Sequence, residues 1–353
     1  FAQDKKKTIA IYAPGTLQEA FWKNVMDLSQ ISADQLGVNL QIGEAKDSRA
    51  TMVRMITDAA KSGKVDGIIV QNFKDAGDKL TEIAQTYKIP IIIFDTPYYL
   101  PKGKVPVPQE KNPFWIAQIT PDNVEAGYRL AEKLVKEAKG AGNTGVIEIL
   151  ALGGAQASAS GEERIAGLNK YVAEHKADVK LNQLTYAEWK RDKASESIEL
   201  LAKRYPNSKV FWCASDGMAY GVKDALAKSG KKVNKDFFTG GVDWINEAFV
   251  DFGKGEMTTT AGAHLFDGGF SVVAMFDHLN GVKMPEVNGK PKTLFLTPMM
   301  VLTKENYPKL KVIEEKKWGS FVDYKQFSRF YNKDLKDYDF SVFKMIKGVE
   351  APK

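Results

Sequence analysis

The feature that most constrains the fold is a repeated alternation between short, continuously apolar segments and longer segments with helical periodicity. In the longer segments, apolar residues recur at spacings of three to five. Continuous apolar strands separated by amphipathic helices are typical of parallel sheets covered on both faces. The expected strands lie at 8–12, 38–42, 65–70, 89–94 and 115–119, then at 146–150, 179–184, 210–214, 237–242 and 257–261.

About five strand–helix units precede Asp122 and about five follow it, and Asp122 is expected to cap a helix that runs to about Lys139. The chain has 353 residues, whereas a domain usually holds roughly 100–200. The sequence therefore predicts an α/β protein of two doubly wound, parallel-sheet lobes. In such sheets ligands bind beyond the carboxyl ends of the strands, so residues that follow strands are the candidates for function.

Composition excludes several classes of protein. The net charge is +6, but lysines are interspersed with acidic residues along the expected helix faces, which indicates a solvated surface and no nucleic-acid partner. No stretch offers the roughly 18 apolar residues that a membrane span needs. Cys213 is the single cysteine, so an internal disulfide is excluded. The histidines, His175, His264 and His278, lack metal-site spacing, so neither a metal nor a cofactor is expected.

The first residues also bear on localisation. The chain begins Phe1-Ala2-Gln3-Asp4, without an initiator Met or an apolar signal region. This beginning is expected of a mature product after removal of a signal peptide, or of a trimmed chain.

Aromatic and polar residues follow the expected strands in a regular order. A sugar has an apolar ring face, which aromatic side chains cover, and a rim of hydroxyls, which carboxylates, arginine and amides satisfy. Such orienting polar groups in an aromatic pocket are typical of a specific binding site. The candidate ligand-binding residues are Glu19, Phe21, Trp22, Asp95, Arg164, Trp189, Ser215, Asp243 and His264.

Seven of the nine candidates also have a structural interpretation. Phe21 and Trp22 could be core at a helix start, and Trp189 could be an exposed loop aromatic. Asp95 and Asp243 could cap the segment after a strand, Arg164 could pair with Glu162 or Glu163, and His264 could be a structural histidine. Asp216 is expected to cap the helix that contains Met218. The ordered recurrence at successive strand ends favours binding.

The ordered set of motifs resembles the type I periplasmic binding proteins, which include the ribose- and galactose-binding receptors and the autoinducer-2 receptor. The resemblance covers roughly Thr8 to Glu305. It is carried by Glu19-Ala20-Phe21-Trp22, by Asp95 after four apolar residues, by Glu163-Arg164 with Gly167-Leu168, by Ser215-Asp216-Gly217-Met218-Ala219-Tyr220-Gly221, and by Gly241-Val242-Asp243.

This resemblance implies a monomeric, non-enzymatic periplasmic receptor. It would close over a small sugar-like polyhydroxy ligand and deliver that ligand to the membrane permease of an ABC transporter. Family topology implies three crossings, near 120–123, 264–268 and 296–298. The N-terminal lobe is then expected to comprise 1–121 plus 266–296, and the C-terminal lobe 122–265 plus 297–353, with an aromatic-rich extension at its end.

Departures from the family pattern bear on the ligand. Thr96 follows Asp95 where ribose receptors have an arginine, and Ser215 stands in place of an asparagine. The proline-rich stretch 97–113 is longer than the usual connection. These differences favour a ligand other than plain ribose or glucose.

Three alternatives stay open. The receptor could present its bound state to a histidine kinase or chemoreceptor instead of a transporter. An enzyme on the same fold is disfavoured because no phosphate loop, nucleophile elbow or dinucleotide fingerprint is present. A ligand-sensing regulator core is disfavoured because no DNA-binding helices precede the first strand.

Overall fold

The computed structural model describes residues 6–99, 107–110 and 112–352. The expectation drawn from Phe1 to Asp4, and that for the 100–106 part of the proline-rich stretch, lie outside the described residues. The chain folds into two compact units, and it passes from one to the other after Pro121, Ala263, Thr297, Lys317 and Met345. Each unit is an α/β layer structure, so the predicted fold class is confirmed.

The first unit is built on a six-stranded sheet in the order β13-β5-β4-β3-β1-β2, and every neighbouring pair is parallel. Its central strands are fully buried because their side chains are apolar on both faces. The strands are β1 (Thr8–Ala13), β2 (Asn39–Glu44), β3 (Gly67–Gln71), β4 (Ile91–Phe94), β5 (Trp115–Pro121) and β13 (Leu294–Thr297).

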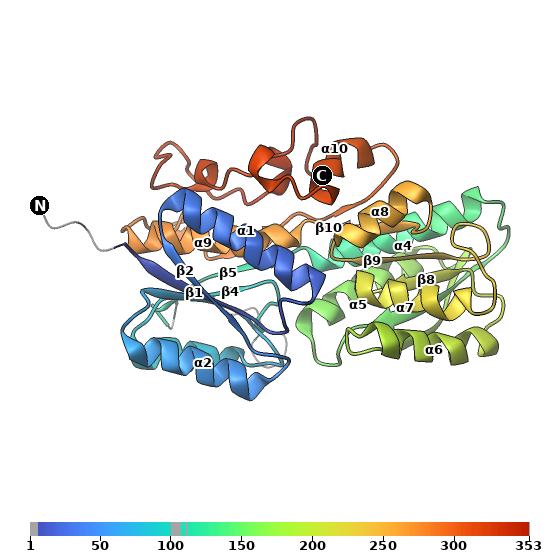
Figure 1. Cartoon of the computed structure of the whole chain (residues 1–353), viewed down its shortest axis with the longest axis horizontal. Helices are drawn as coiled ribbons and strands as arrows, with labels where there is room; N and C mark the ends of the chain where they lie inside the picture. The colour runs from blue at the N-terminus through green and yellow to red at the C-terminus, as the bar shows by residue number, and fades with distance from the viewer. Residues whose placement is uncertain (1–5, 100–106, 111, 353) are drawn as a thin grey trace, which may run out of the picture. The chain divides into compact units, whose positions relative to one another are not determined.

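Helices cover both faces of this sheet, as right-handed crossovers between parallel strands require. Helices α1 and α9 pack together on one face, and α2 lies on the other face with its neighbour α3 (Figure 1). Gly37 ends α1 in the left-handed conformation. The helices are α1 (Ala20–Leu36), α2 (Arg49–Ser62), α3 (Gly77–Tyr87) and α9 (Asp267–Leu279).

The second unit repeats this design with the sheet order β14-β10-β9-β8-β6-β7. Only the edge strand β14 is antiparallel to its neighbour among the strands of this sheet in the described residues. The strands are β6 (Ile147–Gly153), β7 (Val179–Tyr186), β8 (Val210–Cys213), β9 (Phe238–Val242), β10 (Thr259–Gly262) and β14 (Met300–Val301).

In this unit α4 packs on α5, and α6 packs on α7. The predicted cap is confirmed, because the Asp122 carboxylate accepts a hydrogen bond from the Glu125 amide at 3.0 Å and α4 begins at the next residue. The helices are α4 (Asn123–Gly140), α5 (Ala159–Glu174), α6 (Arg191–Arg204), α7 (Asp216–Ala227), α8 (Asn246–Lys254) and α10 (Tyr307–Glu314).

The C-terminal extension differs from expectation. The C-terminal lobe was expected to comprise 122–265 plus 297–353. Trp318–Met345 belongs instead to the first unit, and so do His264, Leu265 and Thr297. The extension lies on the first unit because its aromatic residues pack on α9, where the Phe270 ring lies 5.1 to 5.4 Å from the rings of Tyr324, Phe327 and Phe340. The extension therefore completes the core of the first unit.

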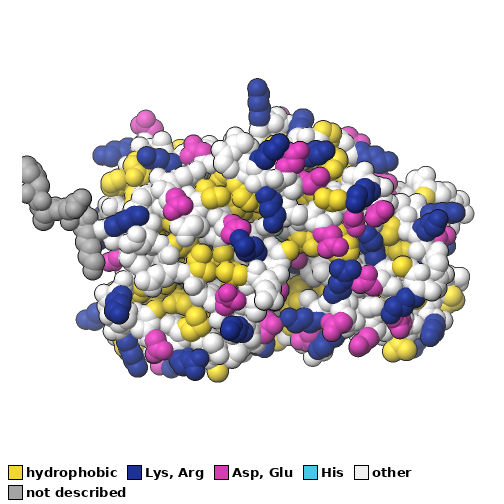
Figure 2. Space-filling model, viewed as in Figure 1, with side chains coloured by type: hydrophobic (Ala, Val, Ile, Leu, Met, Phe, Trp, Pro, Cys, Tyr) yellow, Lys and Arg dark blue, Asp and Glu magenta, His cyan; other side chains and the backbone are white. Residues whose placement is uncertain are grey.

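Acidic and basic side chains are interspersed on the surface. Figure 2 shows lysines and arginines among aspartates and glutamates on the face in view. Many are ion-paired across helix turns, such as Lys79 with Glu82 and Arg129 with Glu125. None of the helices in the described ranges combines the length and apolarity that a membrane span requires.

Candidate functional site

In the first unit the candidate residues follow β1 and β4, and polar residues also end β3 between them. The carboxyl ends of these neighbouring parallel strands lie at one edge of the sheet. Asp95 directly follows β4, and Phe21 and Trp22 begin α1 after the loop that follows β1. The fold thus brings the first unit's predicted residues to the sheet edge at which doubly wound proteins bind ligands.

Asp95 is held tightly at this edge. It is only 6% exposed, and its φ of 62° lies in the left-handed region that residues other than glycine rarely adopt. The side-chain amide of Gln71 and the hydroxyl of Thr96 both donate to its Oδ2 atom. Two donors on one carboxylate oxygen fix the orientation of the other oxygen.

The aromatic residues of the first unit divide into two roles. Trp22 is buried, with its ring edge-on to Phe21 at 5.0 Å and to Phe94 at 6.3 Å. Phe21 is half-buried and lies against the His264 ring, at a centroid distance of 4.6 Å. Trp22 therefore packs into the core and supports Phe21, which stays partly exposed.

Glu19 is exposed, immediately before α1, and its side chain caps no helix amide. Its carboxylate lies over Gly15, where a Cβ would come within 2.7 Å of Glu19 Oε1. The absence of a Cβ at Gly15 thus leaves room for this carboxylate beside the loop after β1.

In the second unit the candidates surround the Arg164 guanidinium, which is 4% exposed. Its Nε donates to Asn123 Oδ1 at 2.9 Å, and its Nη1 donates to the Ala214 carbonyl oxygen at 2.6 Å. Nη1 also lies 3.7 Å from Asp243 Oδ1. These contacts come from the start of α4 and from the ends of β8 and β9, so Arg164 links three elements at one sheet edge.

Trp189 and Asp243 complete this cluster. The Trp189 ring lies 5.8 Å from the Arg164 guanidinium carbon and packs over Gly154, where a Cβ would come within 2.1 Å of the indole. Both residues have positive φ, 61° for Trp189 and 143° for Asp243. Backbone strain of this kind at strand ends motivates a functional hypothesis for the residues that carry it.

The expectation for Asp216 was wrong. Ser215 is the N-cap of α7, and its Oγ accepts from the Met218 amide at 3.4 Å, whereas Asp216 is the first helical residue. Capping uses one acceptor position of the Ser215 hydroxyl, which has a second acceptor position and a donor. Asp216 is instead a buried carboxyl whose Oδ2 accepts from Thr260 Oγ1 at 2.9 Å and from the Ile245 amide at 3.2 Å.

Burial raises the pKa of Asp216 well above its usual range, and the neighbouring Asp243 carboxylate raises this pKa further. Its Oδ1 atom has no hydrogen-bond partner within the described parts of the chain. The first unit contains a similar group, since burial and the charge of Asp95 raise the pKa of Asp267, which accepts from Thr297 Oγ1 at 2.8 Å. Each unit therefore holds a buried carboxyl near its candidate residues whose pKa is raised by burial and by a neighbouring carboxylate.

This environment predicts a pH-dependent stability. Because the folded-state pKa of Asp216 is raised, its contribution to stability is fully present below the unfolded pKa, about 4, and is lost as pH rises through the folded pKa. Asp216→Asn keeps an acceptor for Thr260 without a charge. We expect its free energy of unfolding to fall less than that of the wild type as pH rises, which urea unfolding at a series of pH values measures. An equal decline in both proteins would contradict this account, and exposed Asp334→Asn is the control.

Sequence reasoning missed three side chains. Gln71 holds Asp95, Asn72 ties the Pro97 carbonyl and the Gly77 amide to the end of β3, and Asn123 accepts from Arg164. All three lie at or just after strand ends. Asp95 and Asp243 were predicted because they are acidic residues at strand ends. The same criterion would have identified these three residues if it had included amide side chains.

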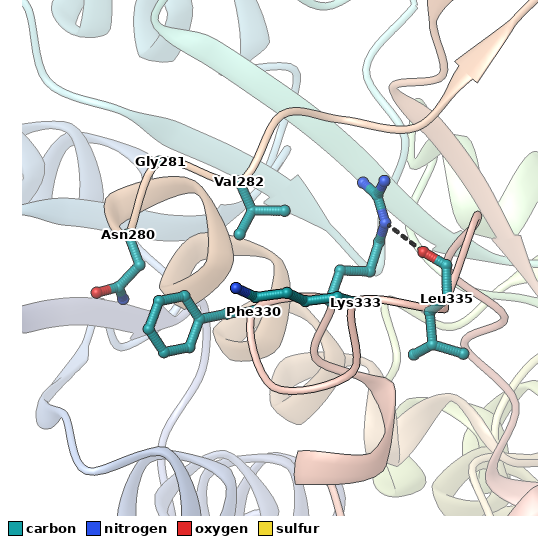
Figure 3. A pocket seen from close by; sticks show the side chains of 7 residues that line it. Asn280, Gly281, Val282, Phe330, Lys333 and Leu335 are labelled. Carbon is teal, nitrogen blue, oxygen red and sulfur yellow. Dashed lines mark hydrogen bonds between the residues drawn. The ribbon is translucent and has the colours of Figure 1, made fainter.

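A pocket of about 350 Å³ lies elsewhere in the first unit, between the end of α9 and the C-terminal extension (Figure 3). Arg329, one of its two charged lining residues, donates to the carbonyl oxygens of Leu335 and Lys283, at 3.0 and 2.6 Å. These bonds give Arg329 a structural role. None of the nine predicted residues lines this pocket, whose lining residues are Asn280, Gly281, Val282, Arg329, Phe330, Lys333 and Leu335.

Comparison with known proteins identifies the family. The family model described as a periplasmic binding protein domain matches residues 9–281. The chain therefore belongs to the periplasmic binding protein family. The match ends before the aromatic-rich extension.

Two relatives and one solved structure illustrate the similarity. The ribose import binding protein of Salmonella typhimurium is 29% identical over 226 residues, which are 64% of this chain and 70% of that protein. The D-allose-binding periplasmic protein of Escherichia coli is 29% identical over 52% of this chain and 58% of its own length. The structure of a periplasmic sugar-binding protein from Pseudomonas fluorescens has a TM-score of 0.82 and 26% identity, with coverage of 95% of this chain and 98% of that one.

Proposed function

We propose that this protein is a periplasmic receptor that binds a neutral, sugar-like polyhydroxy ligand, with residues of both units on the same ligand. The observation that carries the proposal is the Arg164 cluster, in which a buried guanidinium lies beside a carboxylate and a tryptophan at a sheet edge. An aromatic face together with oriented charge-assisted donors and acceptors is the chemistry that binds a ring with hydroxyls.

The charges of the candidate residues favour a neutral ligand. The first unit contributes the carboxylates of Glu19 and Asp95. Arg164 is the one arginine among the candidate residues, and its guanidinium is paired with the Asp243 carboxylate. A phosphate or carboxylate on the ligand would meet like charges among the candidate residues of either unit, which is unfavourable. Hydroxyls, in contrast, donate to carboxylates and accept from arginine.

The named ligands of relatives support the same class. Relatives are named for ribose, D-allose and galactofuranose, and solved structures of the fold contain D-allose and myo-inositol. Thr96 in place of a cation after Asp95 favours a ligand other than ribose. We further propose that hinge closure brings the two units onto the ligand and that the closed form delivers it to an ABC-type permease.

A second candidate keeps the receptor and changes the partner. The resemblance to the autoinducer-2 receptor supports presentation of the bound state to a membrane sensor. Binding of the closed protein to permease or sensor domains would separate the two, whereas ligand binding alone would not.

A thermal-shift panel tests the ligand class. Ligand that binds only the folded state stabilises it by an amount that grows with the ratio of ligand concentration to Kd. We expect at least one of D-allose, D-galactose, L-arabinose, D-ribose and myo-inositol to raise Tm, and D-glucose 6-phosphate and D-galacturonate to leave it unchanged. A shift confined to the two anionic compounds would contradict the proposal, as would a flat panel.

A further inference from the structure

The contacts of Asn123 suggest a role in binding through another residue. Asn123 is the first residue of α4 and the second residue after the chain enters the second unit. It is 1% exposed. Its Oδ1 accepts from Arg164 Nε at 2.9 Å, and its Nδ2 donates to Glu163 Oε2 at 2.9 Å. One amide therefore bridges two consecutive residues of α5.

This bridge has only one chemically consistent orientation. The amide nitrogen faces a carboxylate, and the amide oxygen faces a guanidinium, so a flipped amide would place like groups together. Because Nε lies where the guanidinium joins the side chain, an acceptor there sets the plane of the whole group. The Nη1 bond to the Ala214 carbonyl then sets its direction within that plane.

Two glycines make the bridge possible. A Cβ at Gly127 would lie 1.9 Å from the Arg164 carbonyl oxygen, and a Cβ at Gly167 would lie 2.0 Å from the Val124 carbonyl oxygen. The absence of both Cβ atoms lets α4 and α5 approach closely enough for a short asparagine to reach Arg164. The close packing of α4 against α5 thus serves the placement of one guanidinium.

We propose that Asn123 is a positioning residue for ligand binding, which fixes the guanidinium plane of Arg164 against Trp189 and Asp243. This inference rests on the proposed function, and it adds a residue that itself need not touch the ligand. Asn123 is the second residue of the segment that enters the unit, so the position of this segment also affects the orientation of Arg164.

The first test needs no ligand. The rate at which the Arg164 Nε–H proton exchanges with solvent reports its bond to Asn123. NMR measures this rate, and the signal is assigned by its absence in Arg164→Lys. We expect Asn123→Ala to speed this exchange at least about tenfold, since a buried, bonded proton becomes unbonded. Asn182→Ala is the matched control, because Asn182 also donates to a glutamate, Glu148, in the same unit. Unchanged exchange in Asn123→Ala would overturn the assignment.

The second test measures binding, with D-allose and D-ribose as probes in calorimetry. We expect Asn123→Ala to raise Kd about tenfold, because one charge-assisted bond is lost. We expect Asn182→Ala to lower Tm by an amount similar to Asn123→Ala but to leave Kd unchanged. Equal Kd values in the two variants would overturn the proposal. If the wild type binds neither sugar, the proposed function fails for these probes, and the exchange measurement still decides the role of Asn123.

A rescue experiment separates positioning from general destabilisation. In Asn123→Asp the new carboxylate is repelled by the Glu163 carboxylate, which moves it out of place as the acceptor for Arg164 Nε. We therefore expect the rate of Nε–H exchange and Kd both to rise. Adding Glu163→Gln reverses the donor and acceptor of the bridge and restores complementarity. We expect the double variant to recover slow Nε–H exchange. A double variant that exchanges as fast as Asn123→Asp would contradict a role through this bridge.

Discussion

Arg164→Met is expected to weaken binding about 100-fold for the sugar that raises Tm most in the thermal-shift panel. The reason is that loss of charge-assisted hydrogen bonds costs about 3 kcal/mol. Methionine approximates the length of arginine and retains its apolar packing, so the change removes mainly the guanidinium. The variant also leaves the Asn123 and Ala214 oxygens without their donor and Asp243 without its cation. Isothermal titration calorimetry measures the effect.

The control for this variant is Arg129→Met. Arg129 lies in the same unit and pairs with Glu125 and Glu132 on the surface of α4, with its side chain 45% exposed. Surface pairs of this kind contribute about 0–1 kcal/mol, so Kd should stay within about twofold. Retention of wild-type affinity by Arg164→Met would remove Arg164 from the site.

Asp277→Ala is expected to lower the free energy of unfolding by about 3 kcal/mol, since it leaves several buried donors without an acceptor. Asp277 accepts from the amides of Arg329 and Phe330, at 2.6 and 3.3 Å, from Tyr338 Oη at 2.8 Å and from the Ser328 hydroxyl. One carboxylate on α9 thus anchors the C-terminal extension to the first unit. Burial raises the pKa of Asp277.

Urea unfolding measures this loss, and hydrogen exchange over 318–345 shows whether the extension detaches. Asp339→Ala is the control, because Asp339 is an exposed acid of the same segment that pairs with Lys344. It should change the free energy of unfolding by no more than about 0.5 kcal/mol. If Asp277→Ala unfolds at the wild-type urea concentration, aromatic packing alone holds the extension in place.

Local patterns predicted the elements well, because strand and helix periodicities are set by neighbouring residues. The Asp122 cap was predicted for the same reason. The extension was different: its aromatic residues indicated packing, but no local pattern tells which surface receives them. The choice between Ser215 and Asp216 as cap also depended on Thr260, 44 residues further along the chain, which bonds Asp216 instead.

Candidate site residues were likewise predictable where a local pattern marks them and not where their role depends on distant residues. Asp95, Arg164 and Asp243 could be proposed because strand ends have a known place in parallel sheets. Their partners could not, since Gln71 and Asn123 matter through residues 24 and 41 positions away. Trp22 looked equivalent to Phe21 in sequence, and only the fold shows that one ring is buried and the other half-buried.

We propose that residues of both units bind one neutral polyhydroxy ligand. Calorimetric titration of the wild type, Asp95→Ala and Arg164→Met with the most stabilising panel sugar tests it directly. We expect one site in the wild type and a Kd at least about 30-fold higher in each variant, since each loses buried, charge-assisted bonds. Wild-type affinity in either variant would show that one unit suffices and would contradict the claim.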